Sequence, residues 1–153
     1  MPQIEKIQEK DLKEIQKLIA EEFAYTITLL KPIEERIKRQ NYFFYKISDN
    51  SKILGFIELR IKHSMGEILG VAIKKEFRRK GHAKQLINFA LKFLEQQNCF
   101  AVKLLVGKNN IPALKLYIGL GFKTIRTIEH KKAKEEAYEM MKDLIEPITP
   151  QIM

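Results

Sequence analysis

The spacing of apolar residues along the chain predicts strands and helices in alternation. Residues 3–7 alternate between polar and apolar positions, as in a short strand. A helix is expected next, because apolar residues then recur at helical spacing behind a possible N-cap at Asp11, at Leu12, Ile15, Ile19 and Phe23. Residues 31–37 favour a second helix with Pro32 in its first turn.

Turn residues divide the next part of the chain into strands. Residues 42–48 are rich in aromatic and β-branched side chains, which favour a strand. The polar residues 49–52 then predict a hairpin turn into a strand over 53–62. After a break at 64–66, a further strand is expected over 67–74.

The second half predicts two helices around a buried strand. The helix expected over 82–97 carries its apolar residues on one face, and the apolar segment 100–106 predicts a strand at the centre of the sheet. A helix over 110–120 ends at a glycine, and segments 122–129 and 136–144 predict a final hairpin. The order β-α-α-β-β-β-α-β-α-β-β predicts an α/β fold with one mixed sheet and helices on both of its faces.

Length and composition indicate the number of domains and the cellular compartment to expect. The chain has 153 residues, 45% of them apolar, and no repeat or linker, so we expect a single domain over residues 1–153. No apolar run approaches the roughly 20 residues of a membrane helix, and the charged N-terminus lacks the pattern of a secretion signal. We therefore expect a cytoplasmic protein without a membrane partner. The only cysteine, Cys99, lies in an apolar segment that favours a buried, unreactive thiol.

The net charge of +9 suits an anionic ligand, such as a polyphosphate or a nucleic acid, and disfavours a polycationic substrate. The three histidines, His63, His82 and His130, lack the spacing of metal ligands, so no metal site is expected.

One stretch of the chain combines features of a phosphate site. Gly70 interrupts the apolar strand over 68–73, and a glycine there marks a bulge or the close approach of another backbone. The strand leads into the basic segment Arg78-Arg79-Lys80-Gly81-His82-Ala83, which opens an amphipathic helix. Main-chain N–H groups and the dipole of a helix start attract anions, and small residues at 81 and 83 let phosphate oxygens approach them.

Two motifs resemble the GNAT superfamily of acetyl-CoA-dependent N-acetyltransferases. Arg78-x-x-Gly81-x-Ala83 after a strand is similar to that family's Gln/Arg-x-x-Gly-x-Gly/Ala signature. The segment from Asn110 to Tyr117, followed by Gly121-Phe122, resembles its Asn-x-x-Ala-φ-x-φ-Tyr and Gly-Phe pattern, where φ is apolar. The resemblance covers about residues 53–123.

This resemblance implies roles for individual residues. Main-chain groups of Val71, Ala72 and Ile73 would pair with the pantetheine arm of the coenzyme as an added strand does. Asn110 would contact the coenzyme, and Tyr117 would lie beside its sulfur and serve the leaving group. The residues implied around the pyrophosphate, with Arg78 opening the motif, are Arg79, Lys80, Gly81, His82, Ala83 and Lys84.

The reaction requires a neutral amine to attack the thioester. Deprotonating a lysine amine of pKa about 10.4 at pH 7 costs about 4.6 kcal/mol, whereas an α-amine of pKa about 8 costs only about 1.4 kcal/mol. Glu67 is our candidate for the base, because the strand from Glu67 to Ile73 resembles the one that carries the base in the histone-acetylating branch; the alternative is a solvent-facing glutamate. Glu58 is a weaker candidate that could simply line the wet face of its strand. In the ribosomal-protein alanine branch the base precedes the Asn motif, and that position is Leu105 here, which cannot take a proton.

The acceptor stays open at this stage: a peptide α-amine, a lysine side chain and a small amine all fit, and we expect residues 23–40 and the last hairpin to select among them. Two other hypotheses remain. A basic nucleic-acid-binding module would explain the charge but not Asn110, Tyr117 or Gly121-Phe122. A GNAT-fold sensor would bind acyl-CoA without turnover. The sequence does not indicate the oligomeric state.

Overall fold

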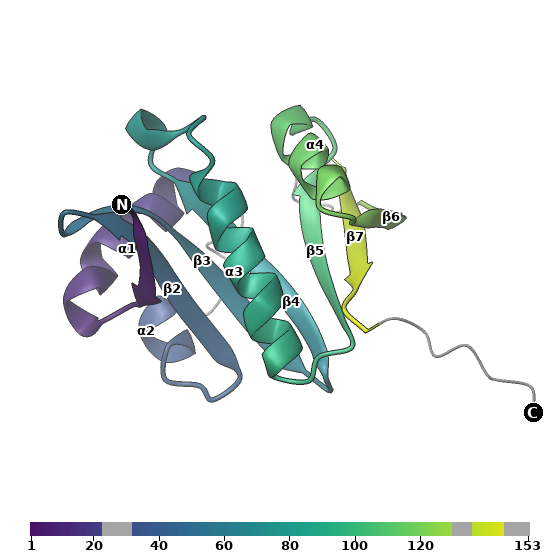
Figure 1. The fold of residues 1–153 in the computed structure, drawn as a ribbon, viewed down its shortest axis with the longest axis horizontal. Helices are drawn as coiled ribbons and strands as arrows, with labels where there is room; N and C mark the ends of the chain where they lie inside the picture. The colour runs from purple at the N-terminus through teal and green to yellow at the C-terminus, as the bar shows by residue number, and fades with distance from the viewer. Residues whose placement is uncertain (23–31, 130–135, 146–153) are drawn as a thin grey trace, which may run out of the picture.

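The computed structural model describes residues 1–22, 32–129 and 136–145, which form one seven-stranded sheet with helices on both faces (Figure 1). The expected α/β fold class and order of elements are confirmed. Short 3-10 helices, η1 (Glu9–Asp11) and η2 (Lys75–Phe77), precede α1 and α3. The strands and α-helices are β1 (Gln3–Lys6), α1 (Leu12–Glu22), α2 (Ile33–Arg36), β2 (Tyr42–Asp49), β3 (Lys52–Lys62), β4 (Met65–Ile73), α3 (His82–Gln96), β5 (Ala101–Gly107), α4 (Ile111–Gly119), β6 (Lys123–Ile128) and β7 (Ala137–Asp143).

The strands lie in the order β1-β2-β3-β4-β5-β7-β6. All neighbouring strands are antiparallel except β4 and β5, which run parallel because α3 connects them as a crossover. The last two strands form the expected antiparallel pair, but the second of them, β7, lies between β5 and β6. This insertion makes β7 the neighbour of β5 and leaves β6 at the edge of the sheet.

The sheet opens between β4 and β5. Their pairing is limited to Met65–Ile68 against Ala101–Leu104. On the other side of β4, Leu59 lies opposite Ile68 and Glu58 opposite Gly70, so Leu69 is an extra, bulged residue. The irregularity expected at Gly70 is therefore confirmed beside it. Because a bulge bends its strand, β4 follows β3 beyond this point and leaves β5.

Two hydrophobic clusters hold the helices to the sheet. Helix α3 buries the apolar face predicted for it, including Leu86, Ile87 and Leu94, against one side of the sheet, and α4 lies on the same side (Figure 1). Helices α1 and α2 cover the other side. Full burial of one such side chain contributes about 1.5–3 kcal/mol. Cys99 is also fully buried, and this burial raises the pKa of its thiol, as expected for an unreactive cysteine.

The start of α1 differs from the prediction. Asp11 lies in η1, and its carboxylate accepts hydrogen bonds from the main-chain N–H of Gln8 at 2.9 Å and from Lys46 Nζ at 2.8 Å. Burial acts to raise the pKa of Asp11, but these bonds and the nearby positive charges outweigh it and lower the pKa. Asp11 therefore ties the start of the helix to β2 instead of acting as its N-cap. Phe23, which continued the predicted pattern, lies outside the described residues.

Candidate active site

The loop between β4 and α3 has the backbone of an anion site. Gly81, the residue before α3, has φ of +83°, and Arg79 has φ of +65°. A Cβ at Gly81 would meet nothing within 4 Å, so the glycine is required by its left-handed conformation and not by lack of space. Neither an acidic residue nor a capping side chain occupies the first turn of α3. Its first N–H groups, which lack helical acceptors, are left for a ligand.

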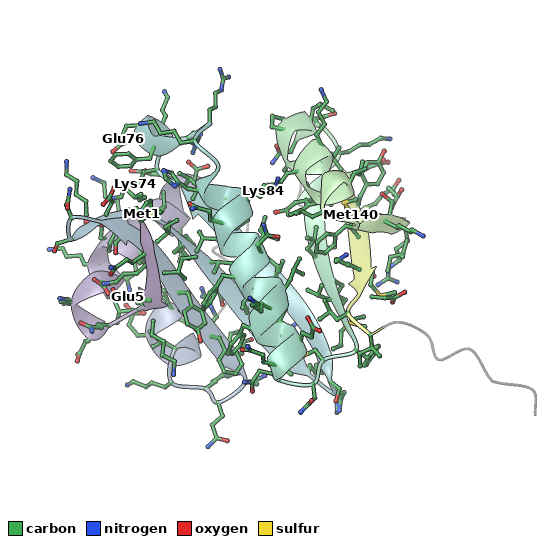
Figure 2. The ribbon with its side chains drawn as sticks, in the orientation of Figure 1. Met1, Glu5, Lys74, Glu76, Lys84 and Met140 are labelled. Carbon is green, nitrogen blue, oxygen red and sulfur yellow. The ribbon has the colours of Figure 1, made fainter. Side chains whose placement is uncertain are left out.

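The positive side chains of this loop fall into two groups. Arg79, Lys80 and Lys84 are exposed, and Figure 2 shows Lys84 on the first turn of α3, on the side toward β5 and α4. Arg78 is exposed as well but differs in being bonded within the protein, because its Nε donates to the Ile73 carbonyl at 2.9 Å and its Nη2 to a carboxylate oxygen of Glu22. Arg78 therefore fixes the loop to the end of β4 and to α1.

His82, at the start of α3, lies with its Nδ1 3.2 Å from Gln85 Oε1 in the same helical turn. Its side chain is therefore directed toward the following residues of the helix. The partly exposed Ala83 leaves the first turn of α3 without a large side chain at that position.

The main chain of β4 offers an open edge toward β5. Lys74 donates its N–H to the Leu54 carbonyl of β3 at 2.8 Å. Because alternate residues of a strand face the same side, Ala72 also turns its main-chain groups toward β3, whereas Val71 and Ile73 turn theirs away. The carbonyl of Ile73 is already bonded to Arg78. Of the three residues predicted to pair with a ligand strand, Val71 is the one whose groups are free to do so.

Helix α4 places Asn110 and Tyr117 at opposite ends of its first two turns. Asn110 is the N-cap, with its side-chain oxygen accepting the Ala113 N–H at 3.3 Å. Tyr117 is only 6% exposed and packs edge-to-face on Phe122 at 5.6 Å between ring centres. Burial raises the pKa of Tyr117 to about 12. Among the described residues its hydroxyl has no hydrogen-bond partner.

Glu67 lies on the face of the sheet that α1 and α2 cover in part. It is 8% exposed, so the alternative of a solvent-facing glutamate does not hold. Its Oε2 accepts from Arg60 Nη2 at 2.6 Å, and Arg60 Nη1 also donates to the Tyr42 hydroxyl at 3.3 Å. Arg60 Nε is buried without a hydrogen-bond partner in the described structure. The carboxylate is thus held in place by a cation.

Glu58 is also buried, and the expectation that it could line a wet face is wrong. Arg36 of α2 binds it through two bonds, Nε to Oε2 at 2.8 Å and Nη2 to Oε1 at 2.9 Å. Burial raises the pKa of Glu58, although the hydrogen bonds and charge of Arg36 and the charge of Arg60 act against it. The pair anchors α2 to β3.

Leu105, at the position where a related branch carries its base, is 59% exposed although it lies on an interior strand. Its cross-strand neighbour on β7 is Glu139, which the sequence analysis did not identify. The side chain of Glu139 is only 11% exposed, and its Oε2 lies 3.2 Å from Arg126 Nη2. The order of β6 and β7 brings these residues together, and no local pattern reports that order.

Two further properties bear on the type of site. The described residues contain no group of three histidine, cysteine, aspartate or glutamate side chains that could hold a metal ion. None of the described helices is long and apolar enough to span a membrane.

Comparison with known proteins agrees with this geometry. The sequence profile of the acetyltransferase (GNAT) family matches residues 9–122. An N-alpha-acetyltransferase from Saccharolobus solfataricus is 32% identical over 116 residues, which cover 67% of this chain and 69% of that protein.

Two solved structures show the same fold. NAA60 from Arabidopsis thaliana, in complex with acetyl-CoA, superposes with a TM-score of 0.82 at 17% identity, over 94% of this chain and 98% of that one. The ribosomal-protein alanine N-acetyltransferase from Escherichia coli superposes with a TM-score of 0.77 at 18% identity, over 100% of both chains. The chain therefore belongs to the acetyltransferase (GNAT) family and is an N-acetyltransferase.

Proposed function

We propose that this N-acetyltransferase transfers the acetyl group of acetyl-CoA to the α-amine of a peptide or protein, by direct attack of the amine on the thioester. The observation that carries the proposal is the open edge of β4 beside the left-handed loop at the start of α3. An extended arm can pair with the main chain of Val71 while its pyrophosphate meets the first turn of the helix. No other feature of the described residues combines a free strand edge with an anion site.

The exposed cations suit a coenzyme that carries phosphates. Arg79, Lys80 and Lys84 surround the helix start, where the helix dipole also favours an anion. Gly81 and Ala83 leave room for phosphate oxygens, and the Asn110 amide lies at the start of α4. Four other predicted residues support the coenzyme site by their positions in the loop and the strand, and not through free polar groups. They are Arg78, His82, Ala72 and Ile73.

The state of the buried carboxylates favours an α-amine acceptor. Glu58 is bound by two bonds from Arg36, and Glu67 is held by Arg60. Each carboxylate would have to give up a bond from its arginine to accept a proton, so the site suits an amine that is already partly neutral at pH 7. An α-amine meets this requirement about 3 kcal/mol more easily than a lysine side chain. The similarity to an N-alpha-acetyltransferase supports the same choice.

In the proposed reaction the acetyl group passes directly from the coenzyme sulfur to the amine nitrogen. The nitrogen lone pair forms a bond to the carbonyl carbon, and the proton that the nitrogen loses passes to water and on to Glu67. When the tetrahedral intermediate collapses, the carbon–sulfur bond breaks and its electron pair stays on the sulfur. Tyr117 donates a hydrogen bond to that sulfur, the thiolate then takes a proton from solvent water, and the thiol of the coenzyme and an N-acetyl peptide are the products.

Binding of acetyl-CoA is the first test. We expect acetyl-CoA to bind and to raise the Tm, as a ligand of the native state must. Reversing the charge at Arg79 or Lys80 should weaken binding by about tenfold at low ionic strength and by less at high ionic strength. Lys62→Glu is the matched control, because Lys62 is exposed at the end of β3 and lies opposite the start of β4, away from the loop before α3. Calorimetry without binding at millimolar acetyl-CoA would refute the proposal, and binding without turnover of any amine would point to a sensor.

A second test concerns Glu67. We expect Glu67→Gln to lower kcat at neutral pH and to approach the wild type at higher pH, where more of the amine is free. Glutamine keeps an oxygen for Arg60, so the Tm should change little. The measurement is a pH–rate profile for both proteins. Overlapping profiles would leave Glu67 as a partner of Arg60 without a part in proton transfer.

A further inference from the structure

The sheet opening leaves one apolar side chain and one carboxylate together on the same face. Leu105 is the first residue of β5 beyond its pairing with β4. Its neighbours Leu104 and Val106 both point into the α3-side cluster, so Leu105 points to the opposite face, which also carries Glu67. At 59% exposed, it is a large apolar side chain that α1 and α2 do not cover. Leu105 therefore borders the opening from the side opposite α3.

Glu139 supplies a carboxylate next to Leu105. The two residues are direct partners in the β5–β7 ladder, and side chains in such antiparallel pairs have Cβ atoms about 5 Å apart. Met140 and Tyr138 pack on the α3 side, which places Glu139 on the same face as Leu105. An apolar contact and a negative charge thus lie side by side at the opening.

The charge of Glu139 is the least compensated among the buried carboxylates of this face. Glu58 accepts two bonds from a buried arginine, and Glu67 accepts one at 2.6 Å. From the residues that the structure describes, Glu139 accepts one contact at 3.2 Å, from Arg126, whose side chain is 64% exposed, and such exposed pairs contribute only about 0–1 kcal/mol. A carboxylate has about four acceptor positions, so most of those of Glu139 remain for a ligand.

From this juxtaposition we infer that Leu105 and Glu139 form the subsite for the acceptor, and that the acceptor is a peptide whose first residue is apolar. The inference rests on the proposed function and names its substrate class. Glu139 binds the α-ammonium, the form that predominates at pH 7, and Leu105 contacts the first side chain. Both groups of the ligand branch from one Cα, which matches two protein side chains on adjacent strands.

The same face disfavours the other amines. Lys103 lies on it two residues from Leu105, paired with Met141, and a second cation of a polyamine would meet this charge. In a lysine side chain the ammonium ends an unbranched hydrocarbon chain. Such a side chain could bind Glu139, but it has no second group on the same carbon to contact Leu105. The charged groups that face Glu139 from the neighbouring strands are Arg126 on β6 and Lys103 on β5.

Steady-state kinetics of the full chain with acetyl-CoA and peptides tests the inference. We expect Glu139→Gln to raise the peptide KM by about 10- to 100-fold, the usual effect of losing a hydrogen bond to a charged group, with little change in kcat or in acetyl-CoA affinity. Glu136→Gln is the matched control. Glu136 precedes β7 and, like Glu139, lies 3.2 Å from a basic side chain, in this case Lys108, but it is exposed to solvent. Adding Leu105→Glu to Glu139→Gln returns a carboxylate to the adjacent position. The peptide KM of this double variant should fall part of the way back toward the wild-type value.

Peptides that differ only in the first residue test the part of Leu105. Leucine at that position should give kcat/KM about tenfold above glutamate, and Leu105→Ser should reduce this preference. A peptide KM for Glu139→Gln within twofold of the wild type, or equal use of all first residues, would overturn the inference while leaving the proposed function intact. Faster turnover of free lysine side chains or polyamines than of α-amines would overturn both the inference and the α-amine acceptor of the proposed function. Absence of turnover by the wild type with every peptide would overturn both.

Discussion

Replacing Tyr117 with phenylalanine is expected to lower kcat by about 10²-fold while the affinity for acetyl-CoA stays nearly constant. Burial raises the pKa of Tyr117 to about 12, so complete proton transfer to a thiolate of pKa about 8.5 would be uphill by about 4.8 kcal/mol. In the proposed mechanism Tyr117 therefore acts on the departing sulfur as a hydrogen-bond donor, which places the expected loss at the lower end of the range for acid catalysis. Single-turnover kinetics with a saturating acceptor measures the effect.

The raised pKa of Tyr117 also fixes the pH range of this experiment. The hydroxyl keeps its proton well above pH 10, so the wild-type rate should not fall through ionisation of Tyr117 below that pH. Phe122→Leu is the control for packing, because it changes the ring that contacts Tyr117 and leaves the hydroxyl in place. A normal kcat with a lowered Tm for the Tyr117→Phe protein would make Tyr117 a core residue only.

Arg36→Met is expected to lower the free energy of unfolding by about 3–5 kcal/mol, because it leaves Glu58 buried without the two bonds that balance its charge. For a domain of this size, the loss corresponds to a fall in Tm of about 10 °C. Arg39→Met is the matched control in the same part of the chain, since Arg39 is exposed. Replacing both members of the pair, as in Arg36→Met with Glu58→Leu, should recover most of the lost stability.

The pH dependence of the Arg36→Met protein distinguishes a charge effect from lost packing. A carboxyl whose pKa is raised by folding is stabilising while it is protonated, and this contribution is lost as the pH rises through the folded pKa. Burial raises the pKa of Glu58 above its usual 4.5, and removal of Arg36 takes away the interaction that opposes this rise. The deficit should therefore be small near pH 4 and grow toward pH 7 in chemical denaturation. A deficit independent of pH would show that Arg36 acts through packing.

The elements of this fold were predictable because each has a local cause. The apolar stripe of α3, the turn before β3 and the glycine that ends α4 are all visible within one segment, and the bulge was expected from Gly70 alone. The glycine turn before α3 was predictable for the same reason, since Gly81 and the helix that follows it are adjacent in the chain. Local spacing can report such features without knowledge of the rest of the fold.

The pairings across the sheet could not be predicted in the same way. Glu58 and Arg36 are 22 residues apart, and their contact depends on how α2 lies across β3. Leu105 belongs to an apolar segment that predicted a buried strand, yet it is exposed because β4 leaves β5 one residue earlier. Glu139 reached this position only because β7 inserts beside β5. Long-range strand order decides these contacts, and hydrophobic periodicity carries no information about it.

Any residue except proline would bring the same N–H and C=O groups to position 71, because they belong to the backbone and not to the side chain. The open edge of β4 can therefore keep its recognition surface while the sequence along it drifts, provided that the replacement still packs as Val71 does. Sequence identity at such positions is accordingly a poor measure of whether two distant members of a family share a ligand.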